Sequence, residues 1–145
     1  MWQKFSQEAR TAVFQAQKEM QALGATICSA DVLFLGIILD RTSSASQILI
    51  HLGANLDQVE KALREAIQAG PQLTWGKSEL SRGSKRAIDV AYDEARGMKD
   101  RLVGTEHVLL GVLQCNEAIA KTVVGENVTS NAVRLVISQM VFSQG

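Results

Sequence analysis

Residues 104–113 read GTEHVLLGVL, and residues 29–38, which lie 75 positions earlier, read SADVLFLGII. Each stretch has a carboxylate, Glu106 or Asp31, at its third position and carries a glycine, Gly111 or Gly36, inside an apolar run. The same offset pairs further residues of like character: Phe5 with Leu80, Ser6 with Ser81, Ala12 with Ala87, Glu19 with Glu94 and Ala45 with Ala120. This register holds from residue 5 to about residue 49, which indicates that the chain contains one structural unit twice.

The first two helices of each copy follow from capping and periodicity. A serine, Ser6 or Ser81, precedes an apolar run with the 3.6-residue spacing of one helix face, so both serines are predicted N-caps. The second helix is expected after Ser29 in the first copy and after Thr105 in the second. Because this helix is apolar on all sides, it is predicted to lie at the centre of each bundle.

A short third helix is predicted over residues 44–52 and 117–124. The fourth is expected to begin near Asn55, where Gln58 could complete a capping box, and near Thr129 in the second copy. Strand-type alternation is missing. The sequence therefore predicts an all-α fold of two tandem four-helix repeats, packed as a pseudo-twofold double bundle.

The division of the chain follows from its single proline. Pro71 lies in the longest stretch without helical periodicity. We expect one domain over residues 1–145, with repeat one at 5–69, a linker at 70–79 and repeat two at 80–141.

Composition excludes several classes of function. Lys and Arg number 15, and Asp and Glu also number 15, so no net field favours nucleic acid or an anionic membrane. The longest apolar run, ADVLFLGIIL, is about half of the roughly 20 residues that span a bilayer. The N-terminal MWQKFSQEAR lacks the apolar region of a signal peptide. We therefore expect a soluble, cytoplasmic protein without nucleic-acid or membrane partners.

No catalytic or metal site emerges from the cysteines and histidines. Cys28 and Cys115 lack metal-type spacing, and neither His51 nor His107 is spaced to act as a base for them. Glu106 and His107 are adjacent on a helix, so they diverge and do not converge on one ligand. His107 aligns with Val32 and is interpreted as a packing residue, with a functional role as the alternative. Glu106 is interpreted as an acid at a helix N-terminus. We predict no cofactor and no metal.

Residues 70–78, GPQLTWGKS, superficially resemble a phosphate-binding loop. That motif has four residues between its first glycine and the Gly-Lys pair, whereas five separate Gly70 from Gly76 here, and Pro71 has no N–H to donate. A linker is the favoured interpretation. A small nucleotide-binding enzyme is the last-ranked alternative.

Three aromatic residues are candidates for a partner surface. Trp2 and Phe5 lie near a terminus and Trp75 lies in the linker, so all three are expected to be partly exposed.

The stretches MWQKFSQEARTAVFQAQKEM, GTEHVLLGVL and SKRAIDVAYDEAR resemble the duplicated N-terminal domain of the ClpC/ClpA-type Hsp100 unfoldases. The resemblance covers essentially the whole chain, although CSADVLFLG stands where the family usually has a second GTEH motif. It implies a non-catalytic module that recruits protein substrates and adaptor proteins for an AAA+ ring working with the ClpP protease. The alternative is a free-standing accessory protein that binds the Clp core or its ring.

The resemblance also implies a ligand. ClpC-type domains of Gram-positive bacteria carry a phosphoarginine site in each repeat, with contributions from the hydroxyl residue that starts the first helix and from the glutamate of GTEH. Carried over, these positions are Ser6 with Asp31 and Ser81 with Glu106. A helix N-terminus can hold a phosphate and a carboxylate can take a guanidinium.

Overall fold

The computed structural model describes residues 3–24, 27–69, 79–114, 124–125 and 127–144. Seven helices lie in these residues: α1 (Gln7–Ala22), α2 (Ala30–Leu39), α3 (Ser44–His51), α4 (Leu56–Ala69), α5 (Arg82–Gly97), α6 (Thr105–Gln114) and α8 (Ser130–Gln144). Two strands of two residues each, β1 (Ile27–Cys28) and β2 (Glu79–Leu80), complete the description. The all-α fold class is confirmed, and the two short strands are the only departure within the described residues.

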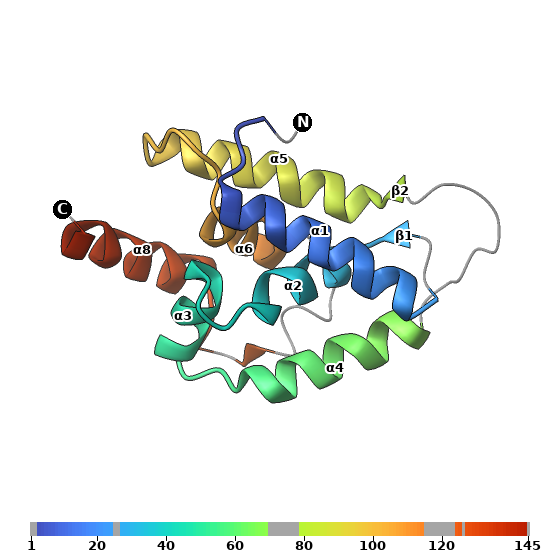
Figure 1. Cartoon of the computed structure of the whole chain (residues 1–145). Helices are drawn as coiled ribbons and strands as arrows, with labels where there is room; N and C mark the ends of the chain where they lie inside the picture. Colours follow the sequence, from blue (N-terminus) through green and yellow to red (C-terminus); the bar gives the residue numbers. More distant parts are fainter. Residues whose placement is uncertain (1–2, 25–26, 70–78, 115–123, 126, 145) are drawn as a thin grey trace.

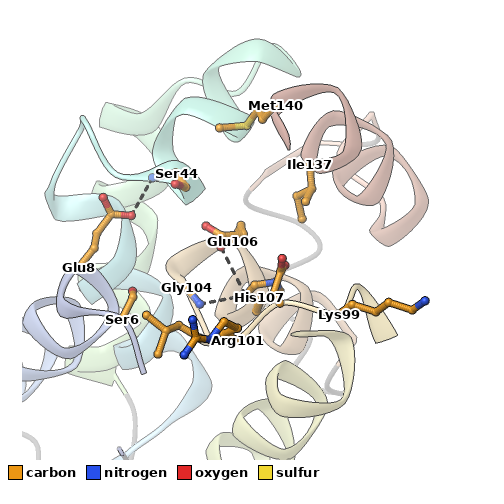
Figure 2. Close-up of a pocket in the computed structure, with 12 residues that line it drawn as sticks. Ser6, Glu8, Ser44, Lys99, Arg101, Gly104, Glu106, His107, Ile137 and Met140 are labelled. Atoms are coloured by element: carbon orange, nitrogen blue, oxygen red, sulfur yellow. Dashed lines mark hydrogen bonds and ion pairs between the residues drawn. The ribbon is translucent and has the colours of Figure 1, made fainter. Parts of the chain in front are cut away.

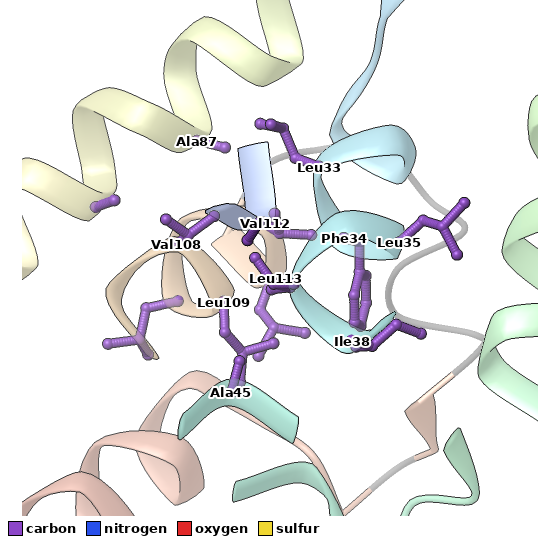
Figure 3. Close-up of a cluster of buried hydrophobic side chains, with 14 of the residues drawn as sticks. Leu33, Phe34, Leu35, Ile38, Ala45, Ala87, Val108, Leu109, Val112 and Leu113 are labelled. Atoms are coloured by element: carbon purple, nitrogen blue, oxygen red, sulfur yellow. The ribbon is translucent and has the colours of Figure 1, made fainter. Parts of the chain in front are cut away.

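Helices α2 and α6 form the centre of the molecule, with α1 and α5 on one side of them and α4 on the other (Figure 1). Eight of the ten residues of each central helix are buried. Their apolar side chains meet in one cluster that includes Phe34, Val108 and Leu109 (Figure 3). The predicted central position of the all-apolar helix is confirmed, because such a helix has no face suited to water.

The central helices approach the outer helices through glycine. A Cβ on Gly36 would lie 2.5 Å from the carbonyl oxygen of Ala12, and a Cβ on Gly111 would collide with the carbonyl oxygen of Ala87. These two contacts are related by the 75-residue offset. Glycine therefore allows α2 to touch the backbone of α1, and α6 that of α5, at the same point of each half.

Two short parallel pairings between extended segments join the two halves. β1 pairs in parallel with β2, with Cys28 opposite Leu80, and Phe5 forms a parallel bridge with Val103. Because residues 5 and 80, and 28 and 103, correspond by the offset, these are the same contact made twice. Each first helix therefore starts beside the second helix of the opposite half.

The predicted helix starts are confirmed at five positions. Side-chain oxygens of Ser6, Ser29, Ser81, Asn55 and Thr129 accept hydrogen bonds from backbone N–H groups in the first turns of α1, α2, α5, α4 and α8. Thr105 differs, since it is the first residue of α6 and not its cap. The third helix predicted over 117–124 lies almost wholly outside the described residues.

Within the described residues, no single helix is long and apolar enough to cross a membrane. Only the bent pair of α2 and α3 meets the requirement for length and hydropathy, and most of its residues are buried in the core.

An ion pair ties α8 to α5. Arg134 donates to Glu94 through Nη2 (2.5 Å) and Nε (3.1 Å), and Gln114 of α6 donates to the same carboxylate. The hydrogen bond from Arg134 lowers the pKa of Glu94, outweighing the opposing effect of burial. A carboxyl group whose pKa is lower in the folded state stabilises the protein at any pH above its unfolded-state pKa. This stabilisation is lost as the pH falls through the folded-state pKa.

Glu94→Gln is therefore expected to lower the free energy of unfolding at pH 7 by about 1 kcal/mol, since Arg134 is partly solvated. It should also reduce the loss of stability below about pH 4.5, the ordinary value for Glu. Urea unfolding between pH 7 and pH 3 measures both effects. Asp93→Asn, at an exposed ion pair on the same helix, is the control and should change neither.

Candidate functional site

A groove with a volume of about 620 Å³ lies where α1, α6 and α8 meet. Ser6, Glu106 and Gly104 line one side of it, and Ile137 and Met140 of α8 line another (Figure 2). Arg101 lies at its rim in the loop before α6, and its side chain makes no hydrogen bond or ion pair with the described residues. The described residues that line the groove thus include three carboxylates (Glu8, Asp100 and Glu106), two basic side chains (Lys99 and Arg101) and an apolar wall.

Glycine at position 104 determines how Glu106 lies. A Cβ on Gly104 would collide with Oε1 of Glu106, so the carboxylate folds back over the glycine backbone. The Glu106 side chain is 22% exposed and lies in the first turn of α6, as the sequence predicted. In the other half, Ser29 takes the place of Gly104 and the shorter Asp31 takes the place of Glu106.

His107 caps the start of α6. Its Nδ1 accepts from the backbone N–H of Gly104 (2.9 Å), because that N–H can only donate, and its Nε2 therefore donates to Oδ2 of Asp100 (2.8 Å). The ring is 1% exposed. Packing between elements is the role that the sequence predicted. Glu106 Oε1 lies 3.4 Å from Nδ1, and since that nitrogen already accepts a hydrogen bond, the carboxylate retains capacity for a ligand.

A polar cluster fixes α3 against this site. Glu8 Oε1 accepts from the backbone N–H of Ser44 (3.1 Å) and from the hydroxyl of Thr105 (3.0 Å). The same hydroxyl oxygen accepts from the N–H of Ala45 (3.1 Å), and Ser43 Oγ accepts from that of Ser46 (3.2 Å). Three unpaired N–H groups at the start of α3 are therefore satisfied by side chains of α1, of α6 and of the α3 cap.

The structure regroups the predicted ligand residues. Ser6 and Glu106 line the same groove, and the backbone N–H of Ser6 donates to the carbonyl of Val103 (2.9 Å). Ser81 instead donates through its N–H to the carbonyl of Cys28 (3.1 Å), just before the helix that carries Asp31. The structure thus groups Ser6 with Glu106 and places Ser81 beside the start of the helix of Asp31, whereas the resemblance paired Ser6 with Asp31 and Ser81 with Glu106. The reason is that the extended segment before each first helix pairs with the opposite half.

The predicted aromatic surface is corrected at one position. Phe5 is 2% exposed and packs against Tyr92 with the ring centroids 5.7 Å apart and the ring planes tilted by 48°, so its expected exposure is wrong. The bridge to Val103 holds this residue inward despite its nearness to the terminus. Trp2 and Trp75 lie outside the described residues.

The cysteines and the GPQLTWGKS stretch are the remaining sequence candidates. Cys28 is buried and forms no disulfide within the described residues, while Cys115 and the GPQLTWGKS stretch lie outside them. Among the residues that the structure describes, no group of three or more His, Cys, Asp or Glu side chains is arranged to hold a metal ion.

Sequence reasoning missed three residues that shape the groove: Glu8, Arg101 and Met140. Glu8 reads as an ordinary first-turn acid, and its repeat equivalent is Gly83, so the internal alignment carries no signal for it. The 75-residue offset does place Arg101 opposite Thr26, and this unmatched charge was a usable signal.

Comparison with known proteins identifies the family to which the chain is similar. The family described as the Clp repeat (R) N-terminal domain matches residues 4–127. Among curated relatives, a ClpA homologue of Guillardia theta is 28% identical over 123 residues, covering 85% of this chain and 15% of that protein. The chloroplastic chaperone ClpC1 of rice (Oryza sativa subsp. japonica) is 27% identical over 142 residues, covering 94% and 16%. The chain thus spans about a sixth of these relatives.

Solved structures share the fold at lower identity. The N-terminal domain of the caseinolytic-protease-associated chaperone ClpD from Arabidopsis thaliana superposes with a TM-score of 0.74 at 18% identity, covering 95% of this chain and 97% of that one. The Hsp104 N-terminal domain of Candida albicans gives 0.75 at 12% identity, covering 92% and 88%. Since the family match extends over most of its length, the chain belongs to the family of Clp repeat N-terminal domains.

Proposed function

We propose that this chain is a non-catalytic recruiting module for a ClpC-like, ATP-dependent unfoldase that works with the ClpP protease. It presents protein substrates or adaptor proteins to the AAA+ ring. The observation that carries the proposal is the groove between α1, α6 and α8, in which Glu106 is partly exposed beside an apolar wall. Such a surface suits recognition of a peptide side chain.

The ligand proposed for this groove is a phosphoarginine side chain. Glu106 can receive the guanidinium part of the ligand in a two-pronged hydrogen bond. Ser6 caps α1 at the same groove, and the first backbone N–H groups of that helix, together with Arg101 at the rim, suit the phosphate. A second site of the same kind is proposed for Ser81, which caps α5, with Asp31 in the first turn of α2.

Calorimetric titration with phosphoarginine tests the ligand. Glu106→Gln keeps the size of the side chain but removes its charge, so it is expected to weaken binding at the groove at least about tenfold. Glu65→Gln makes the same change at an exposed position of α4 and should leave the affinity unchanged. Unmeasurable binding by the folded wild-type chain would refute the ligand assignment.

A chimeric ring tests recruitment. The chain would replace the N-terminal domain of a ClpC-type unfoldase, and degradation of a phosphoarginine-bearing substrate by the ring with ClpP would be followed. The chimera should degrade this substrate faster than a ring without any N-terminal domain. Equal rates for the two rings would contradict the recruiting role.

A further inference from the structure

A second groove lies between α3 and α8 and has a volume of about 510 Å³. Met140 lines both this groove and the first one, so the two grooves adjoin at that side chain. The other residues that line the second groove are Gln47, Ile50 and His51 of α3 and Val136 and Gln139 of α8.

The two grooves differ in chemistry. Among the described residues that line the second groove, only His51 can carry charge, and Ile50 there is 48% exposed. In the first groove, the Glu106 carboxylate faces a space that is also bordered by Ile137 and Met140 (Figure 2). The first groove therefore suits a cation with an aliphatic stem, and the second suits an uncharged apolar side chain.

The wall formed by α3 is held in place before any ligand binds. Glu8, Thr105 and Ser43 satisfy three N–H groups at the start of this helix, from three different elements. Ser46 adds a hydrogen bond to the carbonyl of Asp40 (2.8 Å), which fixes the preceding loop. A wall anchored in this way loses little conformational entropy when a ligand binds against it.

We propose that the two grooves bind one peptide in two places: an arginine-type side chain on Glu106, and an apolar side chain a few residues away along the same peptide in the groove between α3 and α8. The inference rests on the proposed function for the first groove and adds a requirement on the sequence around the bound arginine. The shared lining residue Met140 carries the proposal, together with the change from a groove lined by several acidic and basic side chains to one where His51 is the single titratable side chain among the described lining residues.

Synthetic peptides of glycine and serine with one phosphoarginine test the proposal. Leucine would be placed at each position from one to four residues on either side, and serine would stand there in the reference peptide. The best leucine peptide is expected to bind the full chain about tenfold more tightly than the serine peptide, since one aliphatic side chain becomes buried. Fluorescence anisotropy measures the ratio of the two affinities.

Ile50→Ser is expected to bring this ratio close to one. Its side chain is half exposed, so the substitution leaves the core intact. The matched control is Leu135→Ser, at a 61% exposed side chain of α8 that lines neither groove, and it should preserve the ratio.

Three outcomes would overturn the inference. Equal affinities for leucine and serine at every position, with phosphoarginine still bound, would contradict the second subsite and leave the proposed function standing. Failure of every peptide and of free phosphoarginine to bind would refute both the second subsite and the phosphoarginine ligand proposed for the first groove. Sedimentation that shows dimers of the chain, abolished by Ile50→Ser, would assign the groove to a second copy of the chain.

Discussion

Gly111→Ala should lower the free energy of unfolding by about 3 kcal/mol, the largest effect that we expect from adding a single methyl group. In solution, alanine stabilises a helix relative to glycine by about 1 kcal/mol, so propensity alone predicts the opposite sign. The new Cβ would collide with the carbonyl oxygen of Ala87, which is backbone of α5 and cannot rotate away. The central helix would have to move, and with it the start of α6 that carries Glu106.

Gly97→Ala is the matched control for this prediction. Gly97 is the last residue of α5, and no atom of the described residues outside its own stretch of helix lies within 4 Å of the place where its Cβ would be. Its replacement should therefore be neutral or slightly stabilising. Thermal and urea unfolding measure both variants, and a Gly111→Ala protein as stable as wild type would show that the two helices do not touch at this point.

Thr105→Val is expected to cost about 2–3 kcal/mol, because it removes a hydroxyl while keeping the shape of the side chain. Thr105 is fully buried, and its oxygen accepts from the N–H of Ala45 while its hydrogen is donated to Glu8. Valine would leave the N–H of Ala45 buried without a partner. The loss should also loosen α3, which walls the second groove.

Thr11→Val tests whether the effect comes from burial and not from the hydroxyl alone. Thr11 donates to the carbonyl of Gln7 on the exposed side of α1, where water can replace the lost partner. Its replacement should change the free energy of unfolding by less than about 0.5 kcal/mol. Equal effects at the two threonines, measured by urea unfolding, would contradict the account of the α3 anchor.

The fold could be predicted from sequence because the same helix caps and apolar faces occur in both halves of the chain. Ser6 and Ser81 precede matching apolar faces, and Gly36 and Gly111 stand at the same point of two helices that are apolar on all sides. Capping and periodicity act within a few residues, so they could be read without knowing how the two halves meet.

The candidate site could be predicted only in part, because it lies between the halves. Glu106 and Ser6 were both identified, but periodicity within one repeat does not reveal that residues before α1 lie beside α6. The contact between Phe5 and Val103 joins positions far apart in sequence. Glu8 was missed for a related reason, since its partners Ser44 and Thr105 come from other elements and its repeat equivalent is a glycine.

Titration of the ¹⁵N-labelled chain with phosphoarginine, followed through its amide resonances, shows whether the groove between α1, α6 and α8 binds this ligand. We expect the largest shifts at low ligand concentration at Gly104 and Glu106 and in the first turn of α1 after Ser6. Saturable shifts that leave these residues unchanged, or no shifts at all from a folded chain, would contradict it.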